Sequence, residues 1–411
     1  MDNILGKKID NVIIEPLKYL VSTPISDGPH ETPVYVKEGV PFLSVDAIVD
    51  GNLIINDARF ISEKDAKLYG LKCQPRKGDI LIGKAASTGK IAQVKTDEYF
   101  SIWSPLAMIR PNEMINVTYL EYFLKSKLGQ DQIDNFANVN TQKNVGMQDL
   151  GRVGIIVPDI EKQIKIATFL DEKVSMIDKL INEIKIEISE LRTYFDTYAT
   201  EYLKNHSKTN LKRLKDVCEM KKGPFGSELK KSFFVPKDDN TFKVYEQQHA
   251  IEKNSELGEY YITKGKYEDL YSFNVKPGDI IISCAGTIGE VYILPNNIEP
   301  GIINQALMRV RVNETILKEY FCYVWKYIVL EDILLNSNGS AIKNIPPFSV
   351  LKFLKFFLPT IDEQVKMMEH LQEKKIKIED LISVKMNKIN ELVTYKESLI
   401  YECVTGKKEV I

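Results

Sequence analysis

The chain has 411 residues, 44% of them hydrophobic, and a formal net charge of −2. This length predicts about two to three domains, and the hydrophobic share excludes a disordered chain. The charge balance argues weakly against a polyanion partner, although basic side chains can still gather on one face. The most apolar stretch, residues 320–335, is interrupted by charges, so no membrane-spanning helix is expected. The five cysteines and four histidines are scattered, which favours reduced thiols in the cytoplasm and predicts no metal site.

Residues 1–157 form the first block in chain order and predict a mixed α/β domain. Short β-like runs at 34–36, 41–45 and 79–82 alternate with glycine and proline, and residues 118–128 predict a helix. A turn at Lys77-Gly78-Asp79 precedes the most apolar strand, and Gly89 lies in the turn that closes it.

Residues 158–206 differ completely from this block, since residues 160–203 contain neither glycine nor proline. Apolar residues recur at alternating spacings of four and three, which predicts one long helix with a coiled-coil seam. The predicted seam residues are Ile177, Ile181, Ile184, Ile188 and Leu191.

Residues 207–357 and 358–411 repeat this order of domain and helix. Gly78-Asp79-Ile80 returns as Gly278-Asp279-Ile280, and the helix opening Pro158 to Gln163 returns as Pro359 to Gln364. The period of about two hundred residues is far too long for a solenoid. The predicted seam of the second helix comprises Ile378, Ile382, Ile389 and Leu392.

A helix with one apolar stripe must bury that stripe, so the two long helices are expected to pack on each other. An antiparallel pair would hold the two domains at its ends, about 63 Å apart for 42 helical residues. The expected molecule has an internal pseudo-two-fold and could meet two half-sites or two identical partners.

In these duplicated motifs and their order, the chain resembles the specificity (S) subunit of type I restriction–modification systems. The resemblance implies target-recognition domains at 1–157 and 207–357, with spacer helices at 158–206 and 358–411. Each domain would read one half of a bipartite site in double-stranded DNA. The helices would set the gap and dock two adenine methyltransferase subunits, and restriction subunits would cleave. The chain itself would have no catalytic residues and no cofactor.

Candidate DNA-binding residues follow from side-chain chemistry, because amides, hydroxyls and cations contact base edges and phosphates. In the first domain they are Lys84, Ser87, Thr88, Lys90, Asn140, Gln142 and Lys143. In the second domain they are Lys221, Lys222, Ser227, Gln247, Gln248, His249, Asn304, Gln305 and Lys343. A role in a solvated turn competes at each position. Residues 247–249 have no close match around residues 44–46, which favours them as base readers because two different half-sites need different readers.

Two other classes of function stay open. A scaffold without DNA binding could pair two identical proteins through its repeated helices. An enzyme is disfavoured because the segments that resemble catalytic motifs lack essential features of those motifs. Ile345 stands where the Pro-Pro loop of amino-methyltransferases carries a polar residue, and the nuclease-like Glu183-Ile184-Lys185 lies across the heptad stripe.

Overall fold

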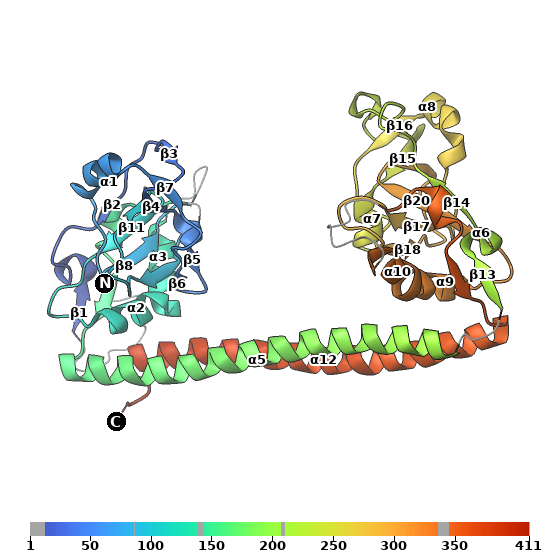
Figure 1. The fold of residues 1–411 in the computed structure, drawn as a ribbon. Helices are drawn as coiled ribbons and strands as arrows, with labels where there is room; N and C mark the ends of the chain where they lie inside the picture. The colour runs from blue at the N-terminus through green and yellow to red at the C-terminus, as the bar shows by residue number, and fades with distance from the viewer. Residues whose placement is uncertain (1–12, 86, 138–142, 207–209, 336–344, 411) are drawn as a thin grey trace. The chain divides into compact units, whose positions relative to one another are not determined.

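The protein is described by a computed structural model that covers residues 13–85, 87–137, 143–206, 210–335 and 345–410. The chain divides into two compact units. Unit 1 comprises Met1–Lys185 with Met386–Ile411, and unit 2 comprises Ile186–Lys385. Each unit combines a mixed α+β domain with parts of two long helices, which confirms the predicted fold class (Figure 1).

The domain of unit 1 is built on small sheets covered by short helices. One sheet has the strand order β2 (Ser26–Asp27), β11 (Leu106–Ile109), β8 (Ile80–Gly83) and β9 (Ile91–Gln93). Another has the order β10 (Ser101–Ile102), β4 (Val40–Leu43), β7 (Arg59–Ile61) and β3 (Tyr35–Val36). The paired strands are β1 (Ile14–Pro16) with β12 (Gly154–Ile156), and β5 (Ile48–Val49) with β6 (Asn52–Leu53). The helices are η1 (Leu17–Tyr19), η2 (Val45–Ala47), α1 (Glu63–Gly70), α2 (Val117–Lys125), α3 (Lys127–Phe136) and α4 (Met147–Leu150).

The domain of unit 2 repeats this plan. One sheet has the order β14 (Cys218–Lys222), β20 (Leu307–Val312), β17 (Ile280–Ser283) and β18 (Val291–Ile293). Another has the order β16 (Tyr261–Thr263), β15 (Thr241–Tyr245) and β19 (Gly301–Ile303), while β13 (Leu211–Arg213) pairs with β21 (Lys355–Phe357). The α-helices are α6 (Leu214–Val217), α7 (Gln247–Ile251), α8 (Lys264–Asp269), α9 (Lys318–Val324), α10 (Leu330–Leu335) and α11 (Phe348–Leu351). The other helical turns are η3 (Lys231–Phe233), η4 (Tyr271–Phe273) and η5 (Trp325–Val329).

Each domain shares one hydrophobic core with its part of the long helices. In unit 1, Ile82 of β8 and Phe123 of α2 belong to the same buried cluster as Leu170 on the first long helix. In unit 2, Ile282 of β17 and Leu371 on the second long helix likewise share a cluster. Burial of these continuous apolar faces is the main force that fixes each domain on its helices.

The long helices are α5 (Ile160–His206) and α12 (Ile361–Val404), and they run antiparallel in each unit. In unit 1, Lys396 Nζ lies 2.6 Å from Asp178 Oδ1, and in unit 2 Lys385 Nζ lies 2.5 Å from Glu187 Oε2. These two lysines occupy positions where the repeat places apolar residues in α5, and both reach a carboxylate on the other helix. Among the described residues, no helix has the length and apolar character needed to cross a membrane.

The predicted seam positions lie on the inner sides of these helices. Four of them are buried, namely Ile177, Ile181, Ile188 and Ile378. The half-buried ones are Ile184, Leu191, Ile382, Ile389 and Leu392.

A buried glutamine at the start of each long helix anchors that helix to its domain. Gln163 is fully buried, and its Oε1 accepts the Asn116 N–H at 2.8 Å. Its Nε2 donates to the carbonyls of Met114 at 3.1 Å and Pro158 at 2.8 Å. Gln364 repeats the arrangement in unit 2 with equivalent backbone partners. The repeated glutamine therefore has a structural role, because both its amide oxygen and its amide nitrogen are hydrogen-bonded.

Candidate nucleic-acid interface

The repeated Gly-Asp turn serves as framework in both units. In unit 1, Asp79 accepts the Arg76 N–H at 2.7 Å and takes two hydrogen bonds of 2.8 Å from the Arg110 guanidinium. In unit 2, Asp279 is held in the same two-pronged way by Arg311, at 2.8 and 2.9 Å. The hydrogen bond to the aspartate raises the pKa of each arginine. Both carboxylates are buried and paired, so this turn orients the neighbouring strand and leaves no free acceptor.

The candidate residues that follow β8 have different degrees of access. Lys84 is buried, with its Nζ 2.7 Å from Asp27 Oδ2. Thr88 Oγ1 donates to the Lys143 carbonyl at 3.1 Å, which joins two candidate segments that are distant in sequence. Lys90 is exposed, and the exposed Lys143 pairs with a neighbouring carboxylate. Ser87 is half-buried within this turn, while Asn140, Gln142 and Lys343 lie outside the described residues.

Asp27 explains why Lys84 is buried. Burial alone would raise the pKa of Asp27, but hydrogen bonds and charges from Lys72 and Lys84 outweigh it and lower that pKa. The carboxylate is thus ionised and compensated inside the domain. Lys84 is therefore a buried ion-pair partner without access to the surface.

In unit 2, close backbone packing brings several candidates together. A Cβ on Gly223 would lie 1.8 Å from the Asn304 carbonyl oxygen, so only glycine permits this approach. The approach places the exposed Lys222, at the end of β14, beside the exposed Gln305. Asn304 itself is buried, and its Oδ1 accepts the Ala306 N–H at 3.0 Å.

Two further candidates of unit 2 lie nearby in the chain. Lys221 makes a cation–π contact, with its ammonium 4.8 Å from the centre of the Phe273 ring. Ser227 is exposed in the turn that follows Gly223.

Helix α7 supplies amide side chains to the same region. Gln247 Nε2 donates to the Thr287 carbonyl at 3.2 Å, which ties α7 to the turn after β17. Gln248 is exposed, and its Nε2 donates to Glu246 at 3.2 Å. His249 is fully buried between the Glu246 N–H and the Leu257 carbonyl, and burial lowers its pKa. Gln248 therefore faces solvent, whereas His249 is a core residue whose ring nitrogens are already bonded.

Strand register aligns α7 residue by residue with the region around residues 44–46, with which the sequence comparison had matched it. The Trp103 N–H donates to the Leu43 carbonyl at 2.8 Å, as the Asn304 N–H donates to the Tyr245 carbonyl at 2.9 Å. β10 lies parallel to β4, as β19 lies parallel to β15. Residues 44–46 therefore correspond to 246–248, and residues 103–104 correspond to 304–305. The parallel pairing of strands far apart in sequence fixes this alignment to the residue.

The two units differ in charge at one more corresponding position. Asp27 pairs with Ala107 across the sheet, and Lys222 pairs with Met308 at the same register. Unit 2 carries Cys284 where unit 1 carries the buried Lys84. Burial raises the pKa of the Cys284 thiol to about 12, although the charge of Lys222 acts in the opposite direction. Unit 1 thus neutralises this strand end internally, whereas unit 2 presents a lysine to solvent.

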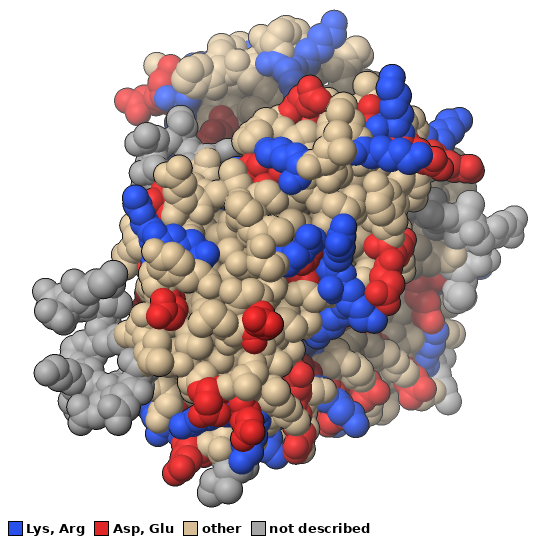
Figure 2. All heavy atoms as spheres, turned by 90° about the vertical axis from the view of Figure 1, so that its left-hand side faces the viewer, with Lys and Arg blue, Asp and Glu red and all other residues tan. Residues whose placement is uncertain are grey.

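The surface charge is mixed where Figure 2 shows it. On the described residues of that face, positive and negative side chains are interspersed over a largely uncharged surface. Mixed charges of this kind attract a polyanion only weakly.

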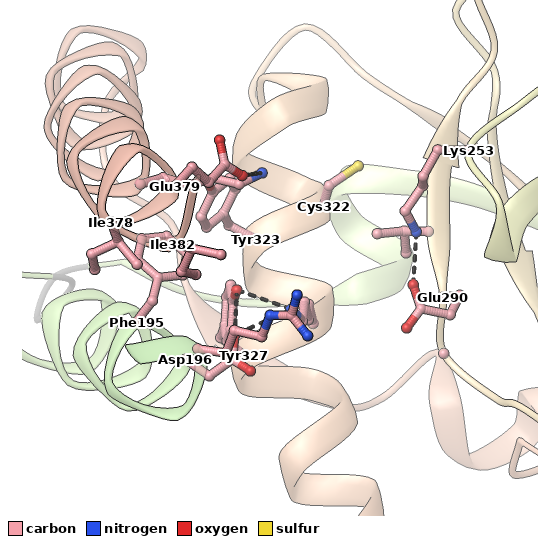
Figure 3. A pocket seen from close by; sticks show the side chains of 15 residues that line it. Phe195, Asp196, Lys253, Glu290, Cys322, Tyr323, Tyr327, Ile378, Glu379 and Ile382 are labelled. Atoms are coloured by element: carbon pink, nitrogen blue, oxygen red, sulfur yellow. Dashed lines mark hydrogen bonds and ion pairs between the residues drawn. The ribbon is translucent and has the colours of Figure 1, made fainter. Parts of the chain in front are cut away.

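Each unit also contains a cavity between its domain and its helices. In unit 2 the cavity measures about 480 Å³. Tyr327 lines it, and its hydroxyl donates to Asp196 of α5 at 2.9 Å (Figure 3). In unit 1 the cavity measures about 680 Å³, and Tyr122 donates to Asp171 of α5 at 2.9 Å. These bonds attach each domain to α5. Within the described residues, no group of three or more His, Cys, Asp or Glu side chains could hold a metal ion.

Comparison with known proteins agrees with this duplicated architecture. The chain is similar to a protein of a type I restriction–modification system, solved for its complex assembly and conformational transition. The identity is 15%, the coverage is 97% of this chain and 98% of that one, and the TM-score is 0.68. It is also similar to the HsdS subunit from Thermoanaerobacter tengcongensis, at 15% identity, 99% and 100% coverage and a TM-score of 0.50. The sequence model of the type I restriction modification DNA specificity domain matches residues 29–190 and again residues 206–392. The chain therefore belongs to the family of type I restriction–modification DNA specificity domains and carries two of them.

Proposed function

We propose that each mixed α+β domain of this chain reads one half of a bipartite site in double-stranded DNA. The observation that carries the proposal is one scaffold built twice with different polar side chains at corresponding positions. Asp46 corresponds to Gln248, and Asp27 corresponds to Lys222. Framework positions such as Asp79 are instead repeated. A protein that reads two different half-sites needs this combination of a common frame and different readers.

We further propose that the long helices dock two copies of an adenine methyltransferase subunit. Four exposed apolar side chains on α5 recur at the same offset on α12. These pairs are Ile160 with Ile361, Ile164 with Val365, Leu180 with Leu381, and Tyr194 with Tyr395. Tyr194 and Tyr395 are 49% and 54% exposed, which leaves large apolar surfaces in contact with water. Exposed apolar positions that recur in both helices suit two identical partners.

In this proposal the chain recognises the DNA sequence and its partners catalyse the reactions. Methylation and cleavage belong to methyltransferase and restriction subunits, and the chain needs no cofactor. The similar protein that was solved in a study of the complex assembly of a type I system supports such a complex. The assembly would work where its DNA substrate lies, in the cytoplasm.

Sequence-selective DNA binding by the purified complex tests the proposal. The full chain is co-purified with its methyltransferase subunit and offered a library of duplexes in a filter-binding assay. We expect retention of duplexes that share two half-sites separated by a gap of fixed length. Formation of the complex without any DNA selectivity would favour the scaffold that only pairs two proteins.

A change in helix length tests the role of the helices as a spacer. Inserting four residues after Glu187 and four at the facing position of α12 lengthens the pair by roughly 6 Å. We expect the same half-sites with a wider gap in a methylation map. Seven-residue insertions are the control, because they preserve the heptad repeat that four residues interrupt. Altered half-sites would contradict a separation between spacer and readers.

A further inference from the structure

A pocket in unit 1 is lined by residues that correspond to the start of α7 in unit 2. It has a volume of about 350 Å³, and its lining includes Tyr35, Phe42, Ser44, Asp46 and Trp103. Phe42 and Tyr35 meet edge to face, with their ring centres 6.4 Å apart. The pocket therefore joins aromatic walls to polar groups at its mouth, a composition typical of sites that orient one flat polar ligand.

The pocket lies at the residues that correspond to α7 and Asn304 in unit 2. Asp46 corresponds to Gln248, and Trp103 corresponds to Asn304, through the matched backbone bonds described above. The two domains thus present different chemistry at one place. Unit 1 has the Asp46 carboxylate, and unit 2 has the Gln248 amide, which donates to the Glu246 carboxylate at 3.2 Å. An amide can donate and accept hydrogen bonds, whereas an ionised carboxylate can only accept them.

Asp46 lies in this pocket together with Arg59 and Asp57. It is exposed, and it forms no ion pair with any of the described residues. The phosphates of DNA repel an unpaired carboxylate. A hydrogen bond that the DNA donates to the carboxylate can offset this repulsion. In the major groove, adenine offers the N6 amino group and cytosine the N4 amino group as donors. Guanine and thymine present oxygen acceptors at the corresponding places, which repel a carboxylate.

We propose that Asp46 is the specificity-determining residue of unit 1 and accepts a hydrogen bond from the amino group of one adenine or cytosine in its half-site. This inference rests on the proposed function and adds a base class to it. A hydrogen bond to an ionised carboxylate is charge-assisted and therefore stronger than one between neutral groups. Unit 2, with Gln248 at the corresponding place, does not impose the same requirement on its half-site.

The test compares Asp46→Asn with the natural chain, each in complex with the methyltransferase subunit. Binding is measured to duplexes in which every position of both half-sites is replaced in turn by each of the other bases. For the natural chain we expect one position in one half-site that accepts only adenine or cytosine. In Asp46→Asn that position alone should lose its discrimination against guanine and thymine, by roughly 5- to 150-fold. Asp97→Asn is the matched control, since Asp97 is an exposed carboxylate of the same unit outside the pocket.

Each other outcome has a distinct meaning. If the natural complex is selective and Asp46→Asn keeps every preference, the assignment of Asp46 is wrong while the proposed function stands. Changes spread over both half-sites, or shared by Asp97→Asn, also overturn the assignment. If the natural complex shows no base preference at all, the proposed function fails and the assignment fails with it. Thermal unfolding of both variants verifies that they remain folded.

Discussion

Replacing Gln364 by alanine should destabilise unit 2 far more than an ordinary surface substitution does. The side chain is fully buried, and its Oε1 accepts the Leu317 N–H at 2.8 Å. Its Nε2 donates to the Thr315 carbonyl at 3.0 Å and to the Pro359 carbonyl at 2.9 Å. Truncation leaves one buried N–H and two carbonyls without these partners, at about 1–3 kcal/mol each. Because the backbone can relax, we take the lower part of this range and expect a loss of about 3–5 kcal/mol in the free energy of unfolding.

The two tryptophans of the chain make this loss measurable for one unit at a time, because Trp103 lies in unit 1 and Trp325 in unit 2. In a Trp103→Phe background, the fluorescence of the buried Trp325 follows the unfolding of unit 2 in urea. With a slope of about 2 kcal/mol per molar urea, Gln364→Ala should lower the midpoint by about 1.5–2.5 M. Gln372→Ala is the control, since Gln372 is exposed on the same helix and should change the free energy by about 0.5 kcal/mol or less. Equal midpoints for the two variants would refute the anchoring role of Gln364.

Three further predictions concern single side chains in the same framework. Asp279→Asn removes the charge that pairs with the Arg311 guanidinium, so thermal unfolding should show a loss of about 2–3 kcal/mol in unit 2. Burial lowers the folded-state pKa of His249, so the unfolded chain binds its proton more readily. The free energy of unfolding should therefore fall as the pH drops below about 6.5, and His249→Gln should lack that component in urea titrations from about pH 8 to about pH 5. Lys385→Ala breaks a partly exposed ion pair with Glu187, so it should cost about 1 kcal/mol or less, with a smaller effect in high salt.

The sequence predicted the parts of the fold that depend on long periodic patterns. The heptad spacing around Ile181 predicted a helix because a single apolar stripe repeated over many turns fits a helical period and does not fit the two-residue period of a strand. The apolar strand at Ile80–Gly83 was equally clear, since a short buried run follows a glycine turn. The repeat itself marked Asp79 and Gln163 as special positions, although their partners came only from the structure.

The candidate site could not be predicted to the same depth, because burial and pairing at single positions depend on contacts that are distant in sequence. Lys84 resembles a surface lysine in the sequence, but its partner Asp27 approaches from another strand of the sheet. His249 resembles a base reader, but the Leu257 carbonyl binds its ring in the interior. The sequence comparison placed residues 247–249 near residues 44–46, but the exact match of Asp46 with Gln248 came only from the parallel strand pairing.

The contrast between repeated and differing positions has a physical consequence for how such a protein changes its target. Repeated residues such as Gln364 and Asp279 are buried and fully bonded, so substituting them costs several kcal/mol of a stability that is itself only about 5–15 kcal/mol for typical proteins. Asp46 and Gln248 are exposed beyond the ends of buried strands, where substitutions usually change stability by about 0.5 kcal/mol or less. A new half-site can therefore be acquired by exchanging these exposed residues, because the strands that position them depend on other side chains.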